Sequence, residues 1–250
     1  MRRLYIISIR KALLLILPIS FFIALFLFLE SNYTTTVFST KDNPRALQAG
    51  NEQANTVALT FNISHGSEQL LPILERLKKE EVIATFFVSG EWAERHPDLL
   101  EKIAEEQHEI GMLGYQYISY TEQEPEEVSK DLNKARDTFY KLGYEDIYLL
   151  RAPNGHLNKE VVSLAEQQGL SVIHWSLNPN DWKNPGTKKI AEDILTNVQN
   201  GDIILLHASD TVKQTEKALE IVLPAIKESR DFVTISELIS QTDTQQELLE

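Results

Sequence analysis

Cysteine is absent from the 250 residues of this chain, so neither a disulfide framework nor a thiolate metal site can form. Basic residues are also scarce, with 24 lysines and arginines against 37 aspartates and glutamates. Four basic residues and no acidic residue precede Glu30, so the remainder carries 20 basic and 37 acidic residues, a formal charge of −17. Such a surface repels phosphate groups, which argues against binding to nucleic acid or to an anionic membrane face.

One long hydrophobic run lies near the amino terminus. Ala12–Leu29 supplies 18 consecutive uncharged, mostly apolar residues. As a helix they span roughly 27 Å, enough to cross the hydrocarbon core of a bilayer. The basic residues within 1–11 predict that the amino terminus stays in the cytoplasm and that the rest is exported. Since no small-x-small cleavage pattern follows, residues 12–29 are expected to form an uncleaved signal anchor, with cleavage and secretion as the alternative.

The rest of the chain divides into three parts by composition. Residues 30–55 are polar and lack periodicity, which predicts a linker, and residues 241–250 resemble a solvated tail. Between them, residues 56–240 alternate short β-branched or aromatic runs with helical stretches. The runs predict seven strands, at Thr56–Phe61, Val82–Val88, Glu109–Leu113, Ile147–Leu150, Ser171–Trp175, Asp202–Leu206 and Phe232–Thr234.

The intervening segments have helical periodicity. The clearest begins near Pro125 and ends at Gly143, with apolar residues at four- and three-residue intervals between them. A similar pattern covers Thr187–Gln199. Seven strand–helix units in series predict an α/β fold with a parallel sheet closed into a distorted barrel, and an open doubly wound sheet is the alternative.

Polar residues gather where the predicted strands end. Because βα loops share one rim of a barrel, side chains in these segments are expected to meet there. The segments are Thr60-Phe-Asn-Ile-Ser-His-Gly66, Gly111-Met-Leu-Gly-Tyr-Gln-Tyr117, Leu150-Arg-Ala-Pro-Asn-Gly155, Asn178-Pro-Asn-Asp-Trp182 and Leu205-Leu-His207.

With these motifs, the stretch from about Val57 to Leu238 resembles the polysaccharide deacetylase family, also called the NodB-homology domain or carbohydrate esterase family 4. The resemblance implies a distorted β/α barrel that removes acetyl groups from polymers such as peptidoglycan. It also implies an Asp base, a divalent metal such as zinc held by Asp and two His, and later Arg-x-Pro-x-Gly, Asp-Trp and Leu-x-His motifs. Within the family the likeness is greatest to a sporulation protein of endospore-forming bacteria, which implies a role in the sporulation cell envelope.

In the first two motifs, the residues that the family pattern implies as base and metal ligands are replaced. Asn62 stands where the family has its base, and Ile63 where it has a metal carboxylate. Leu113 and Tyr117 occupy the two histidine positions. An amide does not accept a proton near neutral pH, aliphatic side chains donate nothing to a cation, and a neutral phenol is a poor zinc ligand. No metal cofactor is therefore predicted, and Tyr115 and Tyr117 are expected to pack or stack in the cleft.

The remaining motifs are intact. Arg151 matches the family residue that orients the base, although Asn62 offers it no negative charge. The resemblance further implies that Asp181 fixes the tautomer of His207, the family's general acid, and that Trp182 forms a wall of the substrate pocket. The full set of retained positions is Arg151, Pro153, Gly155, Asp181, Trp182, Leu205 and His207.

The other histidines carry weaker signals. His108 is expected to be an ordinary surface or capping residue and His174 a hydrogen-bonded core residue. His65 and His156 lie near the same rim as His207, but their spacing matches no recognised ligand set.

Three functions remain open at this point. The first is a metal-free degenerate deacetylase that binds cell-wall or spore-cortex glycan or a protein partner. The second is an active peptidoglycan N-deacetylase, a hydrolase of C–N bonds, which the intact Arg151, Asp181, Trp182 and His207 support. The third is a purely structural interaction module of the spore envelope.

Overall fold

The computed structural model describes residues 45–247. The predicted signal anchor at 12–29 and the first part of the predicted linker lie outside these residues. Within the described part, no helix combines the length and the apolar character needed to cross a bilayer.

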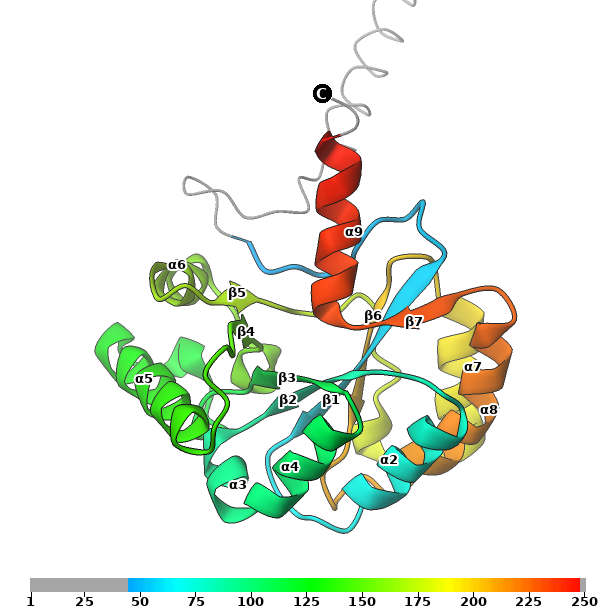
Figure 1. The fold of residues 1–250 in the computed structure, drawn as a ribbon, viewed down its shortest axis with the longest axis horizontal. Helices are drawn as coiled ribbons and strands as arrows, with labels where there is room; N and C mark the ends of the chain where they lie inside the picture. Colours follow the sequence, from blue (N-terminus) through cyan, green and yellow to red (C-terminus); the bar gives the residue numbers. More distant parts are fainter. Residues whose placement is uncertain (1–44, 248–250) are drawn as a thin grey trace, which may run out of the picture. The chain divides into compact units, whose positions relative to one another are not determined.

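Strands and helices alternate along the chain (Figure 1). The strands are β1 (Thr56–Ile63), β2 (Thr85–Val88), β3 (Glu109–Met112), β4 (Leu149–Leu150), β5 (Ser171–Val172), β6 (Ile203–His207) and β7 (Asp231–Val233). The helices are α2 (Leu70–Lys79), α3 (Gly90–Arg95), α4 (Pro97–Glu105), α5 (Pro125–Lys141), α6 (Lys159–Gln167), α7 (Thr187–Asn197), α8 (Thr215–Lys227) and α9 (Ile235–Glu247). Short 3₁₀ helices, η1 (Tyr120–Glu122), η2 (Pro153–Gly155) and η3 (Asp181–Lys183), interrupt the loops.

The seven strands form one sheet, in which every pairing is parallel, so the expected α/β class is confirmed. Its hydrogen-bonded order is β5-β4-β3-β2-β1-β6, and β7 pairs with the start of β1. The sheet is curled, and single bridges join residues near its two ends: Leu47 to Ile173, Ala49 to Asp202 and Leu177 to Ile204. The segment around Leu47, which the polar composition assigned to a linker, therefore packs on the sheet, and Leu47 is buried.

Alternation along the strands separates two apolar layers. Odd-numbered residues of β1, such as Phe61 and Ile63, join the cluster that packs against the helices arranged around the sheet (Figure 1). Even-numbered residues face the concave side, where Ala58 joins a second cluster with Leu238 of α9. Residues 241–247, expected to be tail, belong to α9. The concave face is thus apolar toward the amino ends of the strands and polar toward their carboxyl ends.

Helix α5 shows how the sequence pattern becomes structure. Pro125 takes the first helical position, where its missing N–H costs nothing. Val128, Leu132 and Phe139 lie on the buried stripe that the periodicity predicts. The helix ends because Gly143 adopts a φ of 92° and the N–H of the following tyrosine bonds back to the carbonyl of Phe139 at 2.9 Å.

The loop after β1 is tied to the loop after β6 by Asp210. Its carboxylate accepts hydrogen bonds from the backbone N–H groups of Ser67, Glu68 and Gln69 at 3.0, 2.7 and 3.1 Å. Gly66 is needed here, since its φ is 79° and a Cβ would lie 2.2 Å from Asp210 Cγ. Burial alone would raise the pKa of Asp210, but the three N–H donors outweigh it, so the pKa lies below its ordinary value of 3.8.

Replacing Asp210 by asparagine is expected to destabilise the fold by about 1 kcal/mol at pH 7, because a neutral amide binds these N–H groups more weakly. A depressed carboxyl pKa contributes stability above the unfolded value of 3.8 that is lost as the pH falls through the folded value. The difference between wild type and Asp210→Asn in urea unfolding should therefore shrink below pH 4 or so. Asp231→Asn, which changes an exposed carboxylate at the start of β7, is the control. A difference that does not change with pH would count against this role.

Candidate functional site

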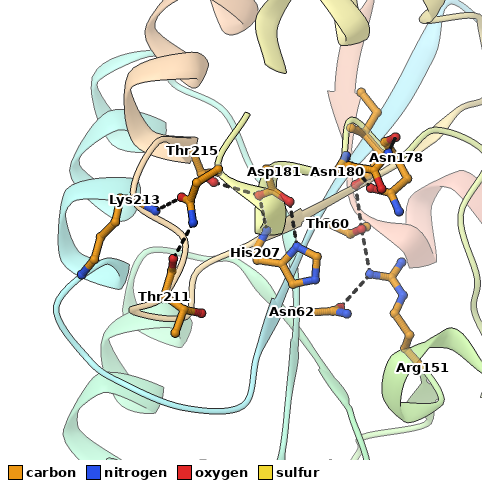
Figure 2. Close-up of polar contacts among 12 residues, drawn as sticks. Thr60, Asn62, Arg151, Asn178, Asn180, Asp181, His207, Thr211, Lys213 and Thr215 are labelled. Atoms are coloured by element: carbon orange, nitrogen blue, oxygen red, sulfur yellow. Dashed lines mark hydrogen bonds and ion pairs between the residues drawn. The ribbon is translucent and has the colours of Figure 1, made fainter. Parts of the chain in front are cut away.

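A cleft of about 470 Å³ opens at the carboxyl ends of the strands, on the rim that the sequence motifs predicted. Part of it is drawn in Figure 2. None of its lining residues among those described is an aspartate, glutamate, lysine or arginine. The lining consists of amides, hydroxyls, imidazoles, aromatic rings and two aliphatic side chains: Asn62, Ser64, His65, Tyr117, Asn154, His156, Trp175, Asn178, Asn180, Trp182, Leu205, His207, Ser209, Thr211 and Val212.

Asn62 and His207 lie side by side at the centre of the cleft, because strand register pairs them across β1 and β6. Asp181, at the start of η3, is fully buried beneath His207. Its Oδ1 lies 2.8 Å from Nδ1 of the imidazole, and its Oδ2 accepts hydrogen bonds from the backbone N of His207 and from Thr215 Oγ1, both at 2.8 Å. The carboxylate thus holds a proton on Nδ1 and leaves Nε2 to the cleft.

Arg151 lies beneath Asn62 and is fully buried (Figure 2). Its Nη1 donates to Thr60 Oγ1 at 2.9 Å and to Asn62 Oδ1 at 3.0 Å, and its Nη2 donates to the carbonyl of His174 at 2.9 Å. The guanidinium also lies 4.0 Å from the ring centre of Phe87. Within residues 45–247 no carboxylate forms an ion pair with it, and its Nε has no hydrogen-bond partner. Burial lowers the pKa of Arg151 to about 9, so the side chain remains cationic at neutral pH but without a counter-ion.

In the turn after Arg151, Asn154 lines the cleft, whereas Pro153 and Gly155 do not. Pro153 is buried, and Gly155 has a φ of 69° with its α-carbon so close to Trp175 that a Cβ would lie 2.1 Å from the indole. Trp175 in turn stacks on His174, with ring centres 3.8 Å apart. Gly155 therefore leaves room for the indole of Trp175, which itself lines the cleft.

Three retained positions, Trp182, Leu205 and His207, line the cleft, together with the substituted Asn62 and Tyr117. Trp182 is 50% exposed, with the ammonium of Lys183 4.9 Å from its ring centre, and Leu205 belongs to the same lining. Tyr117 contributes its phenol, whose pKa is raised by burial although the backbone of Asn154 and the charge of Arg151 oppose the shift. The phenol therefore stays protonated and can donate a hydrogen bond.

Tyr115 does not line the cleft. Its hydroxyl donates to Glu94 at 2.8 Å, the ammonium of Lys134 lies 3.6 Å from its ring centre, and its ring packs beside Gly90. The side chain is buried against α3 and α5 and is not among the residues that line the cleft. The physical reason is the φ of 72° at Gly114, which redirects the chain after β3.

The residues at the family's metal positions do not fit a divalent cation. Ile63 is fully buried in the cluster between sheet and helices, whereas Leu113 is fully buried in the concave cluster, where Tyr117 also packs. The three side chains thus offer two aliphatic groups in separate layers and one phenol. Across the described residues, no group of three or more His, Asp or Glu side chains is arranged to hold a metal.

Most lining residues lie within the motif segments, among them Ser64, His65, Asn178 and Asn180. Sequence reasoning missed Trp175, Ser209, Thr211 and Val212. The signal for the last three was their place immediately after β6. His108, expected at the surface, is instead buried against Phe86 with its Nδ1 accepting a bond from the backbone N of Ala84 at 3.3 Å, and burial lowers its pKa to about 4.

Comparison with known proteins agrees with this arrangement. A family model described as polysaccharide deacetylase matches residues 49–173. A peptidoglycan-N-acetylglucosamine deacetylase of Bacillus cereus is 32% identical over 187 residues, which cover 73% of this chain and 87% of that protein. The peptidoglycan-N-acetylglucosamine deacetylase PgdA of Listeria monocytogenes is 33% identical over 187 residues, and there the chain spans only 39% of the relative's length.

Solved structures lead to the same family. The crystal structure of BA3943, a CE4 family pseudoenzyme from Bacillus anthracis, matches with a TM-score of 0.74 at 27% identity, covering 78% of this chain and 69% of that one. A BA3943 mutant with restored enzymatic activity matches with a TM-score of 0.74 at 27% identity, covering 78% of this chain and 71% of that one. By its matched family model, its curated relatives and its motifs, the chain belongs to the polysaccharide deacetylase family.

Proposed function

We propose that this chain is a degenerate deacetylase that binds cell-wall glycan without hydrolysing it. One observation carries the proposal: Asn62 occupies the centre of a cleft that otherwise keeps the family's His207–Asp181 pair. An amide cannot remove a proton from water near neutral pH. A missing general base by itself costs roughly 10²–10⁴ in rate.

The metal positions add to this deficit. Ile63 and Leu113 have no donor atoms, and among residues 45–247 no three His, Asp or Glu side chains are arranged to hold a cation that would acidify a water molecule. His207 retains an Nε2 that can face a ligand, but a general acid acts on an intermediate that the first step must form. Both reagents of that first step are missing, which favours binding over catalysis.

The chemistry of the lining supports a glycan as the ligand. Amide and hydroxyl side chains match sugar hydroxyls, and the exposed face of Trp182 suits stacking on a pyranose ring. The relatives named as peptidoglycan-N-acetylglucosamine deacetylases support peptidoglycan as the glycan. The structural neighbour described as a CE4 family pseudoenzyme is a precedent for loss of activity on this fold.

We further propose that the domain works outside the cytoplasm, held by residues 12–29 as a signal anchor. The apolar run after the basic residues of 1–11 supports this placement. The resemblance to the sporulation protein PdaB supports a role in the sporulation cell envelope.

Titration of the full chain with chitooligosaccharides, followed by calorimetry, should show binding that Trp182→Ala weakens by about tenfold, because an exposed indole face is lost. Tyr140→Ala removes an aromatic side chain that is 61% exposed on α5, away from the cleft, and should leave affinity unchanged. If the wild-type chain binds no glycan, the structural interaction module becomes the better explanation.

The alternative, an active peptidoglycan N-deacetylase, is favoured by the intact hydrogen bond between Asp181 and His207. Acetate release from chitooligosaccharides separates the two proposals. We expect wild type and His207→Ala to release no more acetate than a protein-free blank. Release by the wild type that falls by about 10² or more in His207→Ala would establish the alternative.

A further inference from the structure

The orientation of the Asn62 amide is set from below by Arg151. A guanidinium has only donors, so the amide must turn its carbonyl oxygen toward Nη1, as the 3.0 Å contact shows (Figure 2). The two N–H bonds of Asn62 are then left for the cleft, which this residue lines. Where the family pattern has a proton acceptor, this chain presents a hydrogen-bond donor.

The charge beneath the cleft is distributed unevenly. The positive charge of Arg151 is met by a hydroxyl, an amide oxygen and a backbone carbonyl, all of them neutral. The negative charge of Asp181 is buried, and its two oxygens together receive three hydrogen bonds, from His207 and Thr215. A ligand at Asn62 therefore meets an N–H donor whose amide is hydrogen-bonded to the cationic Arg151. Both oxygens of Asp181 are already hydrogen-bonded within the protein.

Among the described residues, the rest of the lining contains no carboxylate, lysine or arginine. An ammonium group entering such a cleft would lose hydration without gaining a carboxylate, and this penalty is large for a charged group. An acetamido group is neutral, and its carbonyl oxygen accepts the hydrogen bond that Asn62 offers. The protonated phenol of Tyr117 is a further donor on the same lining.

We propose that the cleft discriminates between glycans by their acetylation state. It binds N-acetylated sugars and does not bind sugars whose amine is free. The proposal rests on the glycan binding argued above and assigns it a selectivity. A chain of this kind would distinguish polymer that catalytic deacetylases have not processed from polymer that they have.

Calorimetry with two tetrasaccharides of equal length, one fully N-acetylated and one fully deacetylated, tests the proposal on the full chain at a pH where the sugar amines are protonated. We expect the acetylated ligand to bind at least about tenfold more tightly. Equal affinity for the two ligands would overturn the reading of acetylation and leave glycan binding standing. Tighter binding of the deacetylated ligand would also overturn the proposed selectivity. If neither ligand binds, both the selectivity and the proposed glycan binding are overturned.

Two variants at one position identify the cause. Asn62→Asp replaces the donor by a carboxylate, so it should weaken binding of the acetylated ligand and strengthen binding of the amine, narrowing the preference by about tenfold. Asn62→Ala removes the donor without adding charge and should weaken only the acetylated ligand. Because Asn62→Asp supplies a counter-ion to Arg151, the melting temperature of this variant should not fall. A change in its ligand preference could then not be attributed to unfolding. An unchanged preference in Asn62→Asp would overturn the role assigned to this amide.

Discussion

The hydrogen bond from Arg151 to Asn62 is the contact on which the chemistry of the cleft depends. A fully buried guanidinium is costly to desolvate, and a carboxylate normally offsets that cost. The family pattern implies an aspartate at this position, another beside it and a divalent cation nearby. Here Asn62 and Ile63 occupy the two carboxylate positions, and neither carries a charge. Arg151 is held instead by hydrogen bonds to three neutral acceptors, on Thr60, Asn62 and His174.

The retained Asp181–His207 pair also makes contacts that tie three elements of the fold together. Asp181 binds the backbone N of His207 and the hydroxyl of Thr215 as well as the imidazole. It thereby joins η3, β6 and the start of α8. These contacts give the pair a structural role that does not depend on hydrolysis.

Much of the fold follows from the sequence because its signals are local. The apolar spacing of α5 and the β-branched run of β1 each identify their element and its buried face. The packing of Leu47 on the sheet was not predictable, because an isolated bridge has no periodicity. Leu47 pairs with the edge of β5 that faces away from β4: its N–H bonds to the carbonyl of Val172, and its carbonyl accepts from the N–H of His174.

The site was predictable to a similar extent. Motif order places Asn62 and His207 on one rim, and parallel register makes them neighbours. The opposite orientations of Asn62 and Ile63 could have been inferred, since successive residues of a strand face opposite sides. The position of Tyr115 could not, because it depends on the backbone turn at Gly114. The burial of Arg151 without a carboxylate is likewise a property of the assembled sheet and appears in no local pattern.

The loss of the metal site is open to direct measurement. The full chain would be equilibrated with excess Zn²⁺, freed of unbound ions by gel filtration and analysed for metal by mass spectrometry. We expect far less than one ion per chain, because Ile63 and Leu113 offer no donor and lie in separate apolar layers. About one tightly held ion per chain, the ratio of a catalytic zinc site, would show that the cleft is still a metal centre and that its chemistry has been misjudged.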